Sequence, residues 1–318
     1  MKLYVEGQPR GETSELRFEP AVHFEGAPPT LERPKFLPII SAHSLATMLV
    51  RKATGRVDGF VIEGPTAGGH NAPPRGRLEI DAQGEPIYGE RDNADLAEMR
   101  KIGLPFWLAG GTGTPEQVNA ALASGAAGVQ VGTLFALCED SGIAPELREG
   151  VLHKLQRGEA EVRTDVRASP TGFPFKVVQL EGTNSEQDLY ERRERICDLG
   201  YLREAYRRED GRLDYRCAAE PVDTYVKKGG KVEDTVGRKC LCNGLMANIG
   251  HAQIRDDRTE RAVLTSGSDL DTVERILARV GRMSYSANDA LDFLLSKLPE
   301  RSRIRLPFRS SKRDLVRV

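Results

Sequence analysis

Between residues 35 and 142 the chain alternates four times between a short apolar run and an amphipathic segment of helical period. The apolar runs are FLPIIS, GFVIEG, PFWLAGG and GVQVGT, and the segments that follow them are SLATMLVRKATG, NADLAEMRKIG, TPEQVNAALASG and LFALCEDSG. Four such units in series require parallel strands that are joined by right-handed crossovers through helices. The sequence therefore predicts an α/β fold with a parallel sheet.

The third unit carries a clear helix start signal. Thr114 is a favourable N-cap, Pro115 occupies the first helical position and Gln117 completes a capping box. This signal places Gly110 and Gly111 at the carboxyl end of a strand, beside the N-terminus of a helix.

Composition excludes several partner classes. The formal charge of −1, from 46 basic and 47 acidic residues, gives no global reason to expect binding of nucleic acid or of an anionic membrane. No window approaches the roughly 18 apolar residues of a membrane-spanning helix, and the first residues lack the order of a signal peptide. We therefore predict a cytoplasmic protein that does not associate with membranes.

Cysteine usage favours reduced thiols. The chain has five cysteines, an odd number, which argues against a disulfide framework. Cys240 and Cys242, with Cys197 and Cys217, could be assembled into a four-thiolate zinc site. The spacing lacks the usual pair of CxxC motifs, so no metal site is predicted.

Three successive strands end in glycine, within EGPTAGGH, LAGGTGTP and QVGTLF. Ligands of α/β folds bind outside the carboxyl ends of the strands, and glycine lets backbone N–H groups approach an anion closely. Each loop taken alone is explained equally well as a tight turn, but three in register favour a phosphate site. A dinucleotide fingerprint is excluded, because Glu116 stands where its third glycine is required.

The histidine after the first of these loops is the candidate catalytic group. In barrels of eight βα units, the loops after strands seven and eight form the standard phosphate site. If LAGG and QVGT are those strands, VIEGPTAGGH contains strand six and His70 lies on the phosphate side of the sheet. A neutral imidazole is well matched to general-base catalysis near pH 7. The alternative is an ordinary surface histidine.

The segments GFVIEGPTAGGH, PFWLAGGTGTPEQVNAALASGAAGVQVGT and CLCNGL closely resemble the nitronate monooxygenases, which are FMN-dependent enzymes with a TIM (β/α)8 barrel. The resemblance is strong over residues 35–141 and continues to about residue 255. It implies oxidation by O2 of a small-molecule substrate, an alkyl nitronate or nitroalkane, to a carbonyl compound and nitrite. It assigns His70 as catalytic base. The cofactor-binding positions that we carry over are Gly68, Gly69, Ala109, Gly110, Gly111, Gln130, Gly132 and Thr133.

The chain departs from the family in its number of units. A full barrel needs eight βα units in about 250 residues, whereas four are evident here and they match the last four of the family. We therefore expect the C-terminal part of a longer enzyme. A half-barrel leaves two open strand edges, which favours self-association into a homo-oligomer.

Four regions are expected along the chain. A segment at residues 169–176, SPTGFPFK, either folds over the barrel mouth or is a connector ordered by its prolines. A hairpin is predicted about Asp210 and Gly211. The regions are a β-hairpin with a Pro-rich connector (1–34), the C-terminal half of the barrel (35–150), a mixed α+β extension near its mouth (151–260) and an amphipathic helix with a basic tail (261–318).

Two other functions remain open from the sequence. A flavin-dependent enoyl-thioester reductase is one, because that related family shares the glycine-glycine-histidine loop. The other is an inactive half-barrel fragment that binds a partner, which is favoured by the missing units.

Overall fold

The computed structural model describes residues 29–256 and 258–299 and, nearer the N-terminus, residues 2–3, 5–6, 8–9, 14–15, 17–24 and 26. The predicted basic tail, residues 301–318, lies outside the described residues. None of the helices in this described part is both long enough and apolar enough to cross a lipid bilayer.

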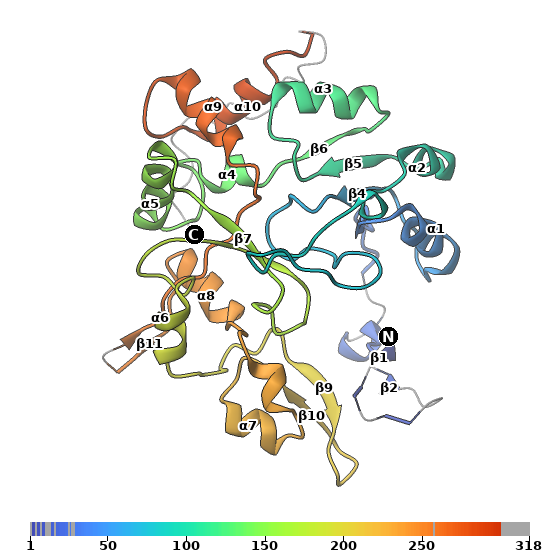
Figure 1. Cartoon of the computed structure of the whole chain (residues 1–318). Helices are drawn as coiled ribbons and strands as arrows, with labels where there is room; N and C mark the ends of the chain where they lie inside the picture. Colours follow the sequence, from blue (N-terminus) through green and yellow to red (C-terminus); the bar gives the residue numbers. More distant parts are fainter. Residues whose placement is uncertain are drawn as a thin grey trace.

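A four-stranded parallel sheet forms the upper part of the molecule in Figure 1. Its strands lie in the order β3 (Ile39–Ile40), β4 (Phe60–Glu63), β5 (Phe106–Ala109) and β6 (Gly128–Gln130). All neighbours are parallel, with Phe60 opposite Phe106 and Trp107 opposite Gly128. The predicted α/β class and the four strands are thus confirmed. In the described residues the sheet is open, with β3 and β6 as its outer strands.

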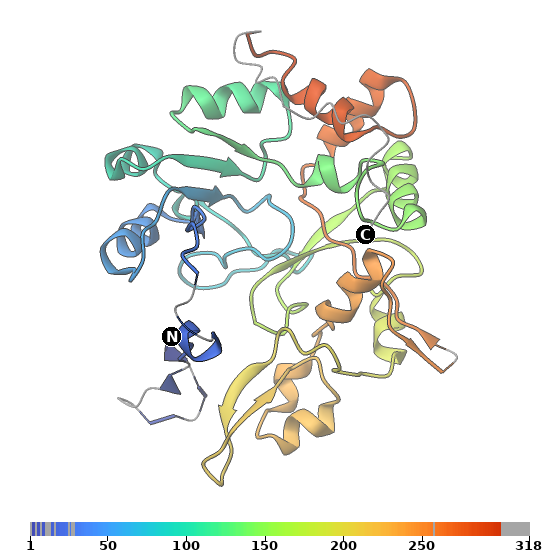
Figure 2. The same cartoon turned by 180° about the vertical axis from the view of Figure 1, so that it is seen from behind.

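Three helices pack on this sheet and connect its strands. They are α1 (His43–Lys52), α2 (Leu96–Ile102) and α3 (Pro115–Ala123), which are seen beside the sheet in Figures 1 and 2. Their buried residues join the strand residues in one apolar cluster, in which Phe60 and Met99 are fully buried. Burial of this helix face against the sheet is what drives the βα units together.

The capping box that begins α3 is present. The Thr114 hydroxyl accepts a hydrogen bond from the Gln117 amide at 3.2 Å, and the Thr114 amide donates to the Gln117 side chain at 2.9 Å. Pro115 is the first helical residue, as predicted. This start fixes the chain direction immediately after the glycines of the β5 loop.

The helix predicted in LFALCEDSG is wrong in extent. Only a single turn, α4 (Thr133–Ala136), follows β6, and the longer α5 (Pro145–Gln156) was not predicted. The residues between them include Gly142, and Pro145 begins α5 because proline is tolerated at the first helical position but not inside a helix. The fourth unit therefore has a short helix and then a second, longer one.

An antiparallel pair follows the parallel sheet. β7 (Val162–Asp165) pairs with β8 (Phe175–Val178), the strand that was predicted within ASPTGFPFKVVQL. Its partner β7 was not predicted. All four residues of β8 are buried, whereas in β7 only Thr164 is, so β8 is the inner strand of the pair.

The largest apolar cluster unites the later helices with the sheet region. It contains buried residues of α3, α4, α5 and β8 together with α9 (Asp271–Val280) and α10 (Ala287–Leu294), and α10 lies against α3 in Figure 2. The amphipathic helix predicted at DLDTVERILARV is therefore confirmed as α9. The proposed division of the chain at residues 34, 150 and 260 stays a prediction.

Most of the remaining elements lie in the lower part of the molecule in Figure 1. The hairpin predicted about Asp210 and Gly211 is confirmed as β9–β10, and the N-terminal β1 and β2 pair antiparallel. Arg216 of β10 links this hairpin to the N-terminal segment through an ion pair with Glu6 at 2.5 Å. The elements are β1 (Lys2–Leu3), β2 (Ser14–Glu15), α6 (Gln187–Arg192), β9 (Glu204–Arg207), β10 (Leu213–Arg216), α7 (Val222–Lys227), α8 (Leu241–Asn248), β11 (Ile254–Arg255), β12 (Arg258–Thr259) and 3-10 turns at Pro20–His23, Glu90–Asp92 and Val232–Thr235.

Replacement of the N-cap of α3 should destabilise the fold measurably. Thr114→Ala removes the acceptor for the Gln117 amide, and loss of an N-cap oxygen costs about 1 kcal/mol. The free energy of unfolding in urea measures the effect. Thr114→Ser keeps the oxygen and is expected to match the wild type; equal stability of Thr114→Ala and wild type would contradict the role of the cap.

Candidate functional site

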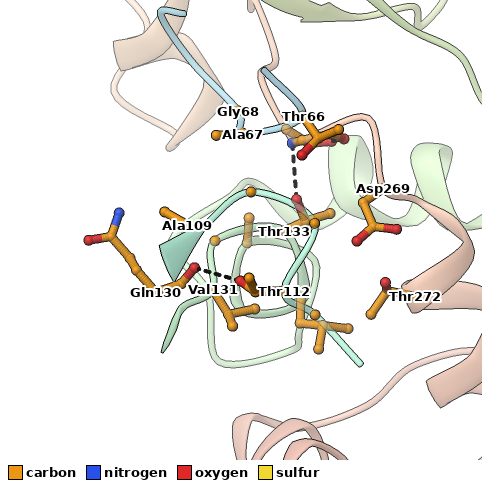
Figure 3. A pocket seen from close by; sticks show the side chains of 18 of the residues that line it. Thr66, Ala67, Gly68, Ala109, Thr112, Gln130, Val131, Thr133, Asp269 and Thr272 are labelled. Carbon is orange, nitrogen blue, oxygen red and sulfur yellow. Dashed lines mark hydrogen bonds between the residues drawn. The ribbon is translucent and has the colours of Figure 1, made fainter. Parts of the chain in front are cut away.

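A pocket of about 290 Å³ lies at the carboxyl ends of β4, β5 and β6 (Figure 3). All eight positions predicted to bind the cofactor line it: Gly68, Gly69, Ala109, Gly110, Gly111, Gln130, Gly132 and Thr133. The structure thus brings together residues from three loops that are up to 65 positions apart in the sequence (68 to 133). The side chain of Gln130 extends away from the side on which Asp269 lies.

The loops after β4 and β5 touch each other through glycine. Gly110 and Gly111 have φ of 80° and 65°, the left-handed region that favours glycine. A Cβ on Gly110 would stand 2.9 Å from the Ala67 amide nitrogen and 3.0 Å from the Thr66 hydroxyl. A side chain at this position is therefore excluded by both conformation and space.

The fourth wall of the pocket is the segment 265–272, which the sequence analysis missed. Thr265 accepts a hydrogen bond from the Gly69 amide at 2.8 Å, and Thr133 accepts one from the Gly267 amide at 3.0 Å. The second bond is drawn in Figure 3. The small residues TSGS just before α9 are the one sequence signal for this wall, because they resemble the glycine-ended loops.

This wall packs as closely as the β5 loop. A Cβ on Gly68 would stand 2.7 Å from the Ser266 carbonyl carbon, and the Ser268 amide donates to the Thr66 carbonyl at 3.1 Å. By contrast, a Cβ on Gly69 or Gly132 would meet no atom within 4 Å. The pocket is therefore closed on the side of residues 265–272 and open at Gly69 and Gly132.

The charge of the pocket comes from two carboxyl groups. Glu63 and Asp269 line it, and no lysine or arginine is among its lining residues. Burial raises the pKa of Glu63, and burial together with a hydrogen bond to Asp271 raises the pKa of Asp269. An anion here would be held by backbone amides and threonine hydroxyls, and protonation of Asp269 would favour it.

His70 follows the pocket wall in the chain but is not one of the lining residues. Its imidazole Nε2 lies 2.6 Å from the Ser169 hydroxyl, and its ring meets Phe175 edge-on with centroids 4.9 Å apart. Partial burial lowers the pKa of this histidine, so the ring is neutral at pH 7. The backbone holds the loop in place, because the Lys176 amide donates to the Gly69 carbonyl at 2.9 Å.

Ser169 is a further site residue that the sequence did not single out individually. It is fully buried, and its hydroxyl also lies 2.8 Å from that of Thr171. Arg238 donates to the Ser169 carbonyl at 2.6 Å. Residues 169–176 thus lie against the histidine loop, but none of them lines the pocket, and whether they fold over a barrel mouth stays a prediction.

The described residues contain no group of three or more His, Cys, Asp or Glu side chains arranged to hold a metal ion. All five cysteines are free thiols, with Cys138, Cys217 and Cys240 buried. The chemistry available at the pocket is thus that of backbone amides, hydroxyl groups, two carboxyl groups and an adjoining imidazole.

Comparison with known proteins identifies the family to which the sequence is similar. The sequence profile of the family described as Nitronate monooxygenase matches residues 29–278. No curated protein matches the chain.

Three solved structures show weak similarity to the chain. FabK from Thermotoga maritima is 17% identical, with 82% of this chain and 60% of that chain covered and a TM-score of 0.43. The enoyl reductase domain of MlnA from Bacillus amyloliquefaciens is 12% identical, with 80% and 64% covered and a TM-score of 0.39. Nitroalkane oxidase from Streptomyces ansochromogenes is 23% identical, with 46% and 38% covered and a TM-score of 0.33. The chain spans less than two thirds of each of these proteins.

A methyl group at Gly68 should loosen the fourth wall of the pocket. In Gly68→Ala the added carbon would press on the Ser266 backbone, and such overpacking costs about 1–3 kcal/mol. Gly132→Ala is the matched control, because a Cβ there meets no atom within 4 Å. Urea unfolding should show lower stability for Gly68→Ala alone; if both variants equal the wild type, the close packing of this wall is wrong.

Proposed function

The chain belongs to the nitronate monooxygenase family, and from that premise we propose that it is an FMN-dependent oxidoreductase. The proposed reaction is the oxidation of alkyl nitronates and nitroalkanes by O2 to a carbonyl compound and nitrite. The observation that carries the proposal is the convergence of all eight predicted cofactor positions on one pocket, with His70 directly after its wall. FMN, when bound, would accept electrons from the substrate and pass them to O2.

The pocket residues fit a phosphate-bearing cofactor in shape and in donor chemistry. We assign the phosphate to the glycines Gly110, Gly111 and Gly132 and to Thr133, because amides without neighbouring Cβ atoms and a hydroxyl group suit an anion. The open space at Gly69 and Gly132 leaves room for a ligand. Asp269 lines the same pocket, and its raised pKa would reduce its repulsion of a bound anion.

His70 would act as the general base toward a neutral nitroalkane. Its lowered pKa keeps the imidazole unprotonated at pH 7, as a base requires. We assign the tautomer in which Nε2–H donates to the Ser169 hydroxyl, so that Nδ1 carries the free lone pair for the α-proton. Ser169 would in this way hold the orientation of the ring, while Phe175 limits its rotation.

We further propose that β3 to β6 are the last four strands of a TIM-type (β/α)8 barrel. The strand order is sequential and parallel, as in such a barrel, and the glycine-rich ends lie at one edge. Ile39 of the outer strand β3 is 56% exposed, and Leu45 and Met48 of α1 are exposed beside it. Further strands, or a second copy of the chain, would cover this apolar edge.

Two assays separate this function from its alternatives. An enoyl-thioester reductase would consume NAD(P)H in the presence of an unsaturated thioester, whereas a nitronate monooxygenase consumes O2 and releases nitrite without a reduced nicotinamide. A chain that binds no FMN and has neither activity would support the inactive fragment.

A branched side chain at Gly132 should weaken FMN binding without harming the fold. Gly132→Val places two methyl groups in the pocket, at a position with ordinary φ and no neighbour within 4 Å. We expect at least about a tenfold loss of FMN affinity, or about 1.4 kcal/mol, in a flavin fluorescence titration. Gly142→Val is the matched control, since it has equally open surroundings outside the pocket. Equal affinity in the two variants would exclude Gly132 from the cofactor site.

Loss of the imidazole should affect neutral and ionised substrates differently. In His70→Asn, turnover of a neutral nitroalkane should fall by about 10²-fold, the effect of losing a general base. Turnover of the corresponding nitronate, which has already lost its α-proton, should change much less. Nitrite release with each substrate form measures the two rates, and an equal loss for both would assign His70 a structural or binding role.

The pH profile provides the control for this assignment. Because burial lowers the pKa of His70 from its ordinary value of 6.5, the acid limb of nitroalkane turnover by the wild type should be centred below pH 6.5, as the imidazole becomes protonated. The profile with the nitronate should lack this acid limb. A limb that is centred above pH 6.5 would contradict the environment described for His70.

A further inference from the structure

Four of the five cysteines pack together in one cluster, and none of them lines the proposed cofactor pocket. Cys217 and Cys240 are buried together with Ala219, and Cys197 and Cys242 pack against them. The cluster is built from the segment after α6, the end of the β9–β10 hairpin and the start of α8. Nothing in the proposed oxidation uses these four thiols.

Two members of this cluster interact directly. Cys197 packs against the buried Cys217, and the Arg203 guanidinium donates a hydrogen bond to the Cys197 carbonyl at 2.9 Å. Interaction with the Cys217 thiol, followed by that with Arg203, lowers the pKa of Cys197 to about 6. Interaction with Cys197, together with burial, raises the pKa of Cys217. Cys197 is therefore the more acidic thiol of the pair.

Cys197 is partly exposed and lies at a surface pocket. It lines a pocket of about 460 Å³ together with three basic side chains, Arg195, Arg203 and Lys228. Three acidic residues line it as well, and each is paired with a basic side chain: Glu220 with Lys228 at 2.9 Å, Glu194 with Arg258 at 3.2 Å and Asp214 with Arg208 at 3.6 Å. Cys217 is 6% exposed and is not a lining residue. A small reagent entering this pocket therefore meets Cys197 first.

We propose that Cys197 and Cys217 form a redox-active dithiol, with Cys197 as the peroxide-sensitive thiol and Cys217 as the resolving thiol. A lowered thiol pKa, a neighbouring guanidinium with access from a surface pocket, and an adjacent second thiol are the properties of reversibly oxidised cysteines. Each of the three is provided here by different residues of the described structure.

The reaction balances with hydrogen peroxide as oxidant. The Cys197 sulfur attacks one peroxide oxygen, the O–O bond breaks, and a sulfenic acid and hydroxide form. The Cys217 sulfur then displaces the hydroxyl group from Cys197, so that the S–S bond forms and water leaves. The hydroxide takes up the proton that Cys197 had released. The two thiols lose two electrons in all, and the peroxide is reduced to two molecules of water.

The cluster is less suited to a metal ion. Ligation by all four sulfurs would require four thiolates, whereas burial raises the pKa of Cys240 to about 11 and that of Cys217 is raised as well. The four sulfurs also do not form a metal-binding group of three or more within the described residues. Pairing of two thiols needs no such arrangement.

Peptide mapping after oxidation tests the proposal on the whole purified chain. The reduced protein is treated with hydrogen peroxide at pH 7, the remaining thiols are blocked with iodoacetamide, and trypsin is added. Trypsin places Cys197 on residues 196–203, Cys217 on 217–227, and Cys240 and Cys242 together on 240–255. The expected product is the peptide 196–203 linked to 217–227, with Cys240 and Cys242 still alkylated. A link between Cys240 and Cys242, or to either of them, would overturn the assignment.

Single variants assign the order of events. In Cys217→Ser, peroxide should leave Cys197 as a sulfenic acid that dimedone labels; in Cys197→Ser, Cys217 should stay reduced. Cys138→Ser is the matched control, because Cys138 is buried in the main core and outside the cluster. Cys197 should also react with iodoacetamide at pH 7 at least about tenfold faster than Cys242 in the wild type. Equal rates, or zinc bound in stoichiometric amount with all four thiols protected, would refute the dithiol.

Discussion

The close backbone approach of four glycine-bearing segments is the constraint on which the site depends. The loops after β4, β5 and β6 and the segment 265–272 meet at distances that leave no room for a Cβ on Gly68, Gly110 or Gly267. The parallel sheet brings the first three segments to one edge, and packing of α9 and α10 on the main core positions the fourth. The pocket is therefore a product of the whole core and not of a single loop.

The parts of this structure that could be predicted are those with a local sequence pattern. The four strands and the capping box at Thr114 are coded by short-range patterns, and the pocket-lining glycines by their places at strand ends. The contacts of Gly69 with Thr265 and of His70 with Ser169 join residues 196 and 99 positions apart, for which one sequence holds no periodic signal. The predicted helix in LFALCEDSG was too long, because the apolar pattern of this segment does not show at which residue the helix stops.

The pocket, His70 and the Cys197 site differ in the charged groups that surround them. The pocket has carboxyl groups whose pKa values are raised and no basic lining residue, so an anion there depends on amides and hydroxyls. The imidazole of His70 is kept neutral by partial burial next to this pocket. At the Cys197 pocket the Arg203 guanidinium lowers the pKa of the thiol. Charge is thus placed where the proposed chemistry at each position needs it.

The most direct test of the central claim is the visible absorption spectrum of the purified chain after incubation with FMN and removal of free flavin by gel filtration. The geometry of the pocket predicts that the flavin absorption band elutes together with the protein. A colourless protein that is folded by circular dichroism would contradict the account, because the converging loops would then not suffice to hold the cofactor.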